Sequence, residues 1–184
     1  MAMRKIIEYC FISADGTFDD PDPVRANIRE YQDEAYVRDS LGLFNACDAM
    51  LWGRTSYELF AQRYARGGGN PAYAARLAAM PKYVFSSKLE TAEWNNTIIV
   101  RGDVVAEVTK LKQQEGGDLV VLGHGLFGET LLKHRLLDVL ALSIYPALLG
   151  RGKPLLRAGQ AVNLKLTATK SFSKIVKLTY EPQY

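Results

Sequence analysis

Short apolar runs alternate with longer amphipathic segments along most of the chain. The apolar runs are rich in Val, Ile, Leu, Tyr and Phe, and their lengths of five to ten residues suit buried strands. They cover residues 4–13, 49–53, 82–87, 96–100 and 118–123. A further extended segment is expected over residues 136–150, with Pro146 near its end.

Between these runs, apolar residues recur at three- and four-residue spacing, which indicates helices. The first helix is expected over Val24–Cys47, with Pro23 before its first turn and a break near Gly42. Asp103 is a suitable N-cap for a later helix that runs to a glycine pair. The other helices are expected over residues 54–65, 72–80, 104–116 and 126–134.

The C-terminal part of the chain has a different pattern. Asn163–Phe172 and Lys174–Pro182 alternate apolar and polar residues about a tight turn at Ser173, which predicts an antiparallel hairpin. Alternating strands and helices predict a mainly parallel sheet with helices on both faces. We therefore expect a single α/β domain over residues 1–184, with three αβα layers and a mainly parallel mixed sheet that ends in the antiparallel hairpin.

The composition of the 184 residues fits a globular protein, with 48% hydrophobic and 23% charged residues. No apolar stretch reaches the roughly 20 residues of a membrane span, and no signal peptide is recognisable, so a cytoplasmic protein is expected. The net charge of +3 includes no concentrated basic block, and nucleic acid is not implied as a partner. Cys10 and Cys47 lie in apolar stretches and are expected to be buried thiols.

Three candidate ligand sites lie where a predicted strand ends. In an open parallel sheet these ends meet at one edge, where the N–H groups of helix N-termini favour phosphate. The first candidate is Trp52–Glu58, in which Gly53 lets a ligand approach the backbone, Arg54 offers a guanidinium and Thr55 a hydroxyl. A helix cap with a solvent-exposed arginine explains this stretch equally well.

The second candidate is the stretch Phe85–Glu90, with the sequence FSSKLE. The hydroxyls of Ser86 and Ser87 and the ammonium of Lys88 suit a phosphomonoester. The alternative is a serine-rich turn with a surface lysine, which needs no ligand.

The third candidate, Gly123–His134, has the sequence GHGLFGETLLKH. Its glycines follow a buried strand and precede a helix, as in a phosphate-binding turn, but no acid follows about 20 residues on as the dinucleotide fingerprint requires. His124 is interpreted as a residue that lies against a cofactor or lines the turn. No metal site is expected, because His134 lies at the far end of the predicted helix.

The loop after the first strand carries three carboxylates, Asp15, Asp19 and Asp20. A carboxylate beside a pocket can orient a substrate or assist proton transfer, and Asp15 is the candidate catalytic residue. A polar turn around Gly16 is the alternative interpretation.

Six stretches, taken in order, resemble the dihydrofolate-reductase-like family that includes the C-terminal reductase domain of riboflavin biosynthesis. They cover nearly the whole chain and read SADGTF, LWGRTSYELF, KYVFSSKLE, WNNTIIVRGD, LKQQEGGDLVVLGHGLFGETLLKHRLLDVL and IYPALLGRGKPLL. The resemblance implies a dihydrofolate-reductase-like fold, an NADPH-type cofactor along the strand ends and, from LGRGKPLL, a homodimer.

The resemblance also implies roles for individual residues. Asp15 and Gly16 would lie in the loop over the nicotinamide. The cofactor-binding residues would be Gly53, Arg54 and Thr55 at the phosphates, Ser86, Ser87 and Lys88 around the adenosine and its 2′-phosphate, and Gly123, His124, Gly125 and Leu126 in the turn beneath the pyrophosphate.

Some positions depart from the family pattern. His124 stands where relatives carry glycine or serine, and it would either restrict phosphate or add a donor to it. Asp138-Val139 replaces the frequent Asp-Glu. The substrate-binding acid of dihydrofolate reductases has only positional candidates, Asp33 and Glu34, which disfavours folate reduction.

The leading hypothesis is an NADPH-dependent reductase of a small heterocyclic or carbonyl substrate. The sequence leaves the choice between NADPH and NADH open. One alternative is a nucleotide-binding homodimer without turnover. Another is a small-molecule binder whose cofactor site is blocked by His124 or by the Arg66–Pro71 loop, which could also act as a lid.

Overall fold

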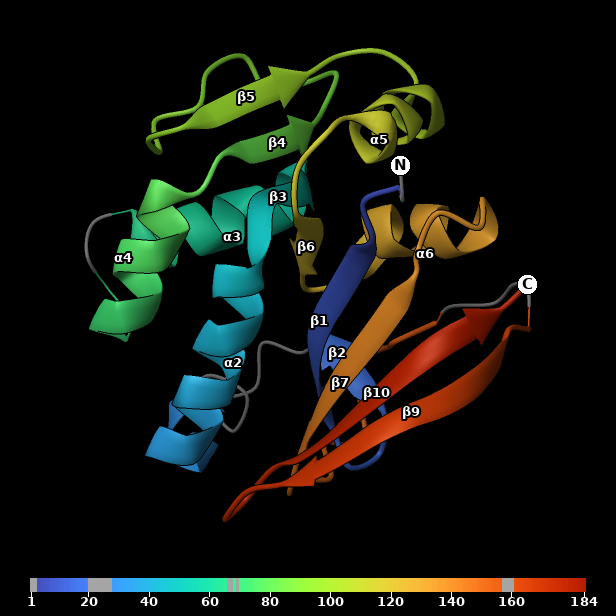
Figure 1. The fold of residues 1–184 in the computed structure, drawn as a ribbon. Helices are drawn as coiled ribbons and strands as arrows, with labels where there is room; N and C mark the ends of the chain where they lie inside the picture. Colours follow the sequence, from blue (N-terminus) through green and yellow to red (C-terminus); the bar gives the residue numbers. More distant parts are fainter. Residues whose placement is uncertain (1–2, 20–27, 66–67, 69, 157–160) are drawn as a thin grey trace.

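The computed structural model describes residues 3–19, 28–65, 68, 70–156 and 161–184 (Figure 1). Its main sheet has eight strands: β1 (Ile6–Ser13), β3 (Cys47–Gly53), β4 (Lys82–Phe85), β5 (Thr97–Val100), β6 (Asp118–Leu122), β7 (Val139–Tyr145), β9 (Asn163–Ser171) and β10 (Val176–Gln183). Their order in the sheet is β5-β4-β3-β6-β1-β7-β10-β9. The strands from β5 to β7 pair with one another in parallel, and β10 pairs antiparallel with both β7 and β9, which confirms the predicted sheet.

Helices cover both faces of this sheet, as Figure 1 shows. One face carries α2 (Glu34–Ala46), α3 (Arg54–Tyr64) and α4 (Pro71–Ala79), and the other carries α5 (Val104–Gln113) and α6 (Gly125–Lys133). The predicted three-layer architecture is therefore confirmed. Within the described ranges, no helix combines the length and the apolar character that crossing a bilayer requires.

Side chains that alternate along the strands build a separate core on each face. On β1, Tyr9 lies in the core beneath α2, α3 and α4, whereas Ile6, Cys10 and Ile12 lie in the core beneath α5 and α6. Successive residues of a strand point to opposite faces, so an uninterrupted apolar run supplies both cores. Glu8 is the charged residue of β1, and it too is fully buried.

The long helix predicted over Val24–Cys47 is wrong in its extent. Residues 24–27 lie outside the described ranges, and the remainder forms a 3-10 turn, η1 (Ile28–Tyr31), followed by α2. The Asp33 carboxylate accepts the N–H of Tyr36 at 2.7 Å and so caps the start of α2. The break therefore falls beside Asp33, while Gly42 lies inside α2 with no atom within 4 Å of the place where a Cβ would be.

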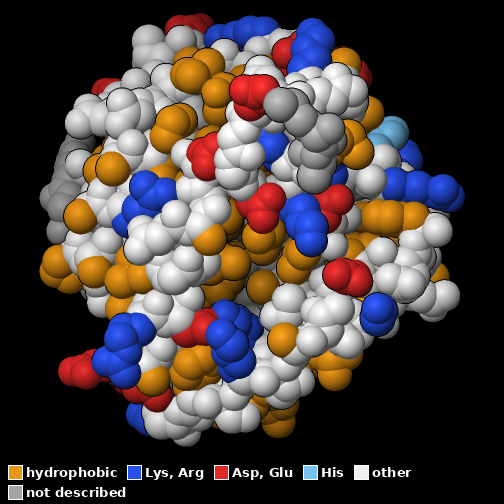
Figure 2. Space-filling model, in the orientation of Figure 1, with side chains coloured by type: hydrophobic (Ala, Val, Ile, Leu, Met, Phe, Trp, Pro, Cys, Tyr) orange, Lys and Arg blue, Asp and Glu red, His pale blue; other side chains and the backbone are white. Residues whose placement is uncertain are grey.

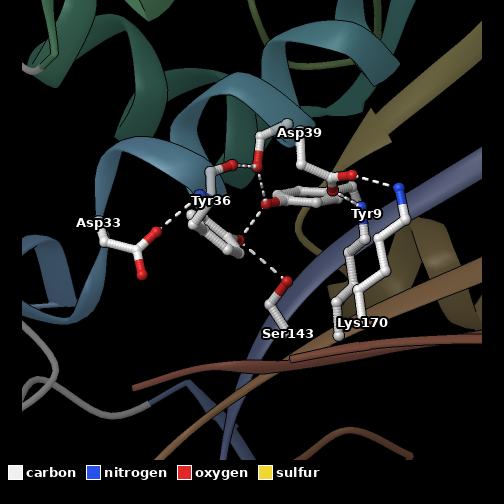
Figure 3. Close-up of polar contacts among 8 residues, drawn as sticks. Tyr9, Asp33, Tyr36, Asp39, Ser143 and Lys170 are labelled. Carbon is white, nitrogen blue, oxygen red and sulfur yellow. Dashed lines mark hydrogen bonds and ion pairs between the residues drawn. The ribbon is translucent and has the colours of Figure 1, made fainter. Parts of the chain in front are cut away.

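Buried hydroxyl groups fix α2 to the sheet (Figure 3). The hydroxyl of Tyr9 on β1 shares hydrogen bonds with the hydroxyls of Tyr36 and Ser40 on α2. Tyr36 also donates to the Ser143 hydroxyl of β7 at 2.9 Å. Burial raises the pKa values of Tyr9 and Tyr36 above their usual range, so both phenols stay neutral. This network holds α2 in place as one wall of the pocket described below.

The C-terminal hairpin predicted around Ser173 is confirmed, and its strands are β9 and β10. The N–H of Phe172 donates to the carbonyl of Ile175 at 2.8 Å and closes the turn. Lys170 of β9 and Lys177 of β10 both pair with Asp39 of α2; Figure 3 shows Lys170 beside Asp39. These ion pairs attach the hairpin to the helical layer.

Figure 2 shows the face of the molecule that Figure 1 presents. Lys and Arg side chains are interspersed with Asp and Glu on this face and do not merge into one basic field. Near its centre the surface is hollowed, and hydrophobic side chains surround the hollow.

Candidate functional site

A pocket of about 860 Å³ lies at the carboxyl ends of the central strands. Its walls include the ends of β3 and β6, the starts of α3 and α6, and side chains of α2 and α4. Ligands of open parallel sheets bind at this edge, where strand ends and helix N-termini meet. The position of the pocket is therefore the one that the strand–helix pattern favours.

A short two-stranded ribbon borders the same pocket. It consists of β2 (Thr17–Asp19) and β8 (Lys153–Pro154), which pair antiparallel although the sequence analysis places β2 in a loop. Phe18 of β2 and Lys153 of β8 line the pocket. Two segments far apart in the chain thus form one side of the site.

Two of the three predicted ligand stretches meet at this pocket. Gly53, Arg54 and Thr55 line it from the β3–α3 junction. The glycine turn, residues 123–126, lines it from the β6–α6 junction. Because β3 and β6 are neighbouring parallel strands, both helix N-termini lie at the same edge of the sheet.

Arg54 lies at the border of the pocket with its side chain 45% exposed. Its Nε lies 3.8 Å from Oε1 of Glu58, one helical turn further along α3. An exposed ion pair at this distance contributes little, so the guanidinium can leave Glu58 for an anionic ligand. Thr55 is exposed beside it.

The glycine turn has a backbone conformation that favours glycine. Gly123 and Gly125 have φ values of 86° and 65°, which residues other than glycine rarely adopt. The N-cap of α6, His124, makes no side-chain hydrogen bond to the helix. The first-turn N–H groups of α6 therefore have no side-chain cap, which suits a phosphate.

The imidazole of His124 points to the sheet and contacts a residue that the sequence analysis does not identify. Its Nδ1 lies 2.6 Å from Oε1 of Glu8 on β1, and both side chains are buried. The ring of Phe18 meets the imidazole edge-on, with centroids 5.9 Å apart. The sequence feature that could have identified Glu8 is a single acidic residue within an apolar strand.

Of the second predicted stretch, Phe85–Glu90, Phe85 lines the pocket, whereas Ser86, Ser87 and Lys88 do not. The Ser86 hydroxyl accepts the N–H groups of Lys88 at 3.1 Å and Leu89 at 2.9 Å. Ser87 and Lys88 are exposed. This is the geometry of the serine-rich turn, and the cofactor roles of Ser86, Ser87 and Lys88 stay predictions.

Asp15 also lies outside the residues that line the pocket. Its carboxylate accepts the Ser13 hydroxyl and the N–H groups of Leu149 at 3.0 Å and Gly150 at 2.7 Å. The hydrogen bonds from Ser13 and from Gly150 hold the pKa of Asp15 below its usual value of 3.8. Its catalytic role stays a prediction, whereas the geometry favours a link between two loops.

Aromatic side chains line another part of the pocket, which we call the aromatic side. It is formed by Tyr9, Phe11, Phe44, Phe60, Tyr64 and Tyr73. Tyr9 and Tyr73 each meet Phe44 edge-to-face, with centroids 5.5 Å and 5.7 Å apart. Such a surface suits a flat ring. No local sequence pattern predicts this surface, because its members come from four separate elements.

The positional candidates for a substrate-binding acid have other partners. Asp33 caps α2 and also accepts the N–H of Ser173 at 2.8 Å. Glu34 forms an exposed pair with Arg38. Among the described residues that line the pocket, Glu129 is the single carboxylate, and it lies on α6 rather than on the aromatic side.

Two expectations concern metal chemistry. Cys10 and Cys47 are buried free thiols, as predicted. In the part of the chain that the structure describes, no group of three or more His, Cys, Asp or Glu side chains is arranged to hold a metal ion.

The loop Arg66–Pro71, expected as a lid, includes residues 66, 67 and 69, which lie outside the described part of the chain.

The fold and this pocket define an α/β protein with a ligand-sized pocket at the strand ends, and comparison with known proteins identifies its family. The chain matches the RibD C-terminal domain over residues 4–178 and belongs to that family. The resemblance found in the sequence is thereby confirmed. The uncharacterized protein YyaP of Bacillus subtilis (strain 168) is 34% identical over 142 residues, which cover 74% of each chain.

Solved structures share the fold at low identity. A Shewanella sp. PV-4 protein, provisionally named for riboflavin biosynthesis, has a TM-score of 0.72 at 18% identity and covers 98% of this chain and 99% of its own. The riboflavin biosynthesis reductase Rib7 of Saccharomyces has a TM-score of 0.62 at 14% identity and covers 100% and 91%. At these identities, the likeness establishes the fold.

Proposed function

We propose that the protein is an NADPH-dependent reductase that transfers hydride to a small heterocyclic or carbonyl substrate. The observation that carries this proposal is a single pocket lined both by residues suited to phosphate, 53–55 and 123–126, and by the aromatic side. Membership of the RibD C-terminal domain family supports the same reaction class. The nicotinamide would supply the hydride. The protein would hold the nicotinamide ring against the substrate and exclude water.

The border of the pocket fits a dinucleotide. The N-terminus of α6 has no side-chain cap, and a Cβ added at Gly125 would meet no atom within 4 Å, so a ligand can approach the backbone. Arg54, at the start of the neighbouring helix α3, would pair with a phosphate bound at this turn. Gly53, Thr55 and the glycine turn would complete the cradle.

The substrate would lie against the aromatic side. A planar ring buried there would contact Tyr9, Phe44 and Tyr73, which are themselves buried. Gln32 and Arg63 line the same pocket and offer polar groups to substituents on that ring. This arrangement supports a small heterocycle or an aromatic carbonyl compound.

NADPH titration followed by its fluorescence tests the proposal. Arg54→Ala is expected to weaken binding by roughly 1.5–3 kcal/mol, because a charge-assisted hydrogen bond is lost. Arg38→Ala is a matched control, since Arg38 on α2 forms the same type of exposed pair, also 3.8 Å long, with Glu34. The absence of saturable NADPH binding up to about millimolar concentration would rule out the cofactor site.

A nucleotide-binding protein without turnover is the second candidate. It is favoured because the described aromatic side has no carboxylate and Asp15 is engaged by two loops. A protein that binds NADPH but oxidises it with no pyrimidine, pterin or carbonyl compound would support this candidate. Oxidation in the presence of any one of them would exclude it.

We also infer that the protein is a homodimer. The edge strand β9 is exposed along its whole length, and Leu164 and Leu166 on one of its faces are 39% and 52% exposed. Unpaired edge strands with exposed apolar residues are prone to associate. Light scattering should give a molar mass twice that of the monomer. Leu166→Glu should dissociate the dimer and give the mass of the monomer.

A further inference from the structure

A carboxylate and an imidazole are buried against each other beneath the glycine turn. Glu8 is 0% exposed and His124 2% exposed, and the pair is joined between Oε1 and Nδ1 at 2.6 Å. Burying ionisable groups is costly unless their polar atoms are satisfied. A pair at this position therefore calls for a physical reason.

Gly128 makes room for the pair. A Cβ at this position would lie 2.4 Å from Nδ1 of His124 and 2.5 Å from Oε2 of Glu8. Glycine inside a helix costs up to about 1 kcal/mol relative to alanine. The helix α6 thus gives up stability at residue 128 so that these two side chains can lie side by side.

Half of the polar atoms of the pair have no protein partner. Within the described ranges, neither Nε2 of His124 nor Oε2 of Glu8 makes a hydrogen bond. Because Nδ1 is turned toward Glu8, Nε2 lies on the opposite edge of the ring. His124 also lines the pocket and is the N-cap of α6, the position at which a helix receives an anion.

We propose that His124, held by Glu8, is a proton-dependent donor to a phosphate oxygen of the bound dinucleotide, an inference that rests on the proposed cofactor site. With Nδ1–H donated to Glu8, a neutral imidazole has only a lone pair at Nε2 and cannot donate to phosphate. One proton taken up at Nε2 creates the donor. The positive charge is then balanced by the Glu8 carboxylate on one side and the phosphate on the other.

The other groups near the pair do not supply this proton. Phe18, which covers the imidazole from β2, carries no charge. Tyr184, at the C-terminus, has its pKa raised to about 12 by burial and by Asp138 and Glu8, so it stays neutral. Among the described residues that line the pocket, the other ionisable side chains with a formal charge are Arg54, Arg63, Lys153 and Glu129, and His124 is the one histidine.

Calorimetric titration of the full chain with NADPH, and separately with inorganic pyrophosphate, tests the proposal. Each titration is run between about pH 6 and pH 8.5, in two buffers with different heats of ionisation. We expect the unaltered protein to take up about one proton more per ligand bound than His124→Asn does, a difference in which the titration of the ligand's own phosphate groups cancels. The association constant should fall by up to about tenfold per pH unit on the alkaline side.

Two conservative variants isolate the pair. His124→Asn retains an N–H for Glu8 but cannot titrate, and Glu8→Gln retains an acceptor but loses the charge. His124→Asn should abolish this proton uptake and flatten the pH profile, and Glu8→Gln should weaken both effects, because the imidazolium loses its counter-charge. His134→Asn alters the other histidine, which is the exposed C-cap of the same helix, and should leave both unchanged. Because the chain has two histidines, NMR of the unaltered protein also follows the imidazole directly.

The outcomes separate this proposal from the proposed function. NADPH binding that is independent of pH and draws no proton would overturn the role of His124 and leave the cofactor site standing. Absence of NADPH binding would contradict the proposed function, and the pyrophosphate titration then decides. Proton-linked pyrophosphate binding that His124→Asn abolishes would support an anion site at His124; pH-independent binding, or none, would overturn it.

Discussion

Gly53 and Phe127 set the spacing between the two helix N-termini that face the pocket. A Cβ built at Gly53 would lie 3.2 Å from the Cβ of Phe127, which is tighter than ordinary van der Waals contact. Gly53 precedes α3, and Phe127 lies in the first turn of α6. The backbone of Gly53 has φ −76° and ψ 161°, which any residue can adopt, so close packing rather than conformation accounts for this glycine.

Gly53→Ala is expected to lower the free energy of unfolding by about 1 kcal/mol and to weaken NADPH binding several-fold, because α3 and α6 must separate. Gly42→Ala is the matched control. Its added methyl group enters open space within α2, so it should raise the free energy of unfolding by about 0.5–1 kcal/mol. Urea unfolding measures both, and equal stabilisation by the two changes would contradict the packing argument.

Gly128→Ala tests the space beneath α6. The added methyl group would overlap His124 and Glu8, so we expect the free energy of unfolding to fall by about 1–3 kcal/mol despite the better helix propensity of alanine. In a background that carries both Glu8→Ala and His124→Ala, the overlap is gone and the same change should become stabilising. Urea unfolding is measured with and without Gly128→Ala, in the unaltered protein and in the Glu8→Ala, His124→Ala background. If Gly128→Ala changes the free energy of unfolding equally in both backgrounds, the overlap with the pair is contradicted.

The parts of the site that could be predicted from sequence are those that neighbouring residues determine. Gly53, Arg54 and the glycine turn directly follow apolar strands, and parallel strands bring such junctions to one edge. The apolar runs predicted the strands for the same local reason. The helix break near Gly42 was wrong because the cap at Asp33, rather than glycine, determines where α2 begins.

The remainder depends on contacts between distant parts of the chain. Glu8 and His124 are 116 residues apart, and nothing in the strand around Glu8 identifies its partner. Likewise, Asp15 contacts Leu149 and Gly150 across 134 and 135 residues. A turn that is rich in aspartate predicts a carboxylate near the strand ends. Which groups that carboxylate binds is decided by tertiary structure.

Lys82 gives a prediction at the opposite end of β4 from the pocket. Its ammonium group is fully buried and donates to the carbonyl oxygens of Ala78, Met80 and Asn95 at 3.2, 2.8 and 2.8 Å. Lys82→Met leaves these acceptors without their donor. We expect it to lower the free energy of unfolding by about 1–3 kcal/mol at neutral pH and to leave NADPH affinity unchanged.

Lys82 should also make stability depend on alkaline pH. Burial lowers its pKa from 10.5 to about 8, so between these values the unfolded chain binds more protons than the folded one. The contribution of Lys82 to the free energy of unfolding therefore rises with pH across this window, by about 3 kcal/mol in all. Subtracting the pH profile of Lys82→Met isolates this rise, and parallel profiles would contradict it.

Asp15 offers the sharpest contrast between a catalytic and a structural role. Its carboxylate joins the turn after β1 to the segment before β8, so Asp15→Asn should loosen that segment and speed tryptic cleavage after Arg151, which is exposed. Asp103→Asn is the control, because asparagine also caps a helix and α5 begins there.

The hydrogen bonds that lower the pKa of Asp15 stabilise its charged form. Their contribution is therefore present above pH 3.8 and is lost as the pH falls through the lower pKa of the folded state. If trypsin cleaves Asp15→Asn at the same rate as the unaltered protein, but the variant no longer oxidises NADPH with a substrate, Asp15 would be assigned to catalysis instead.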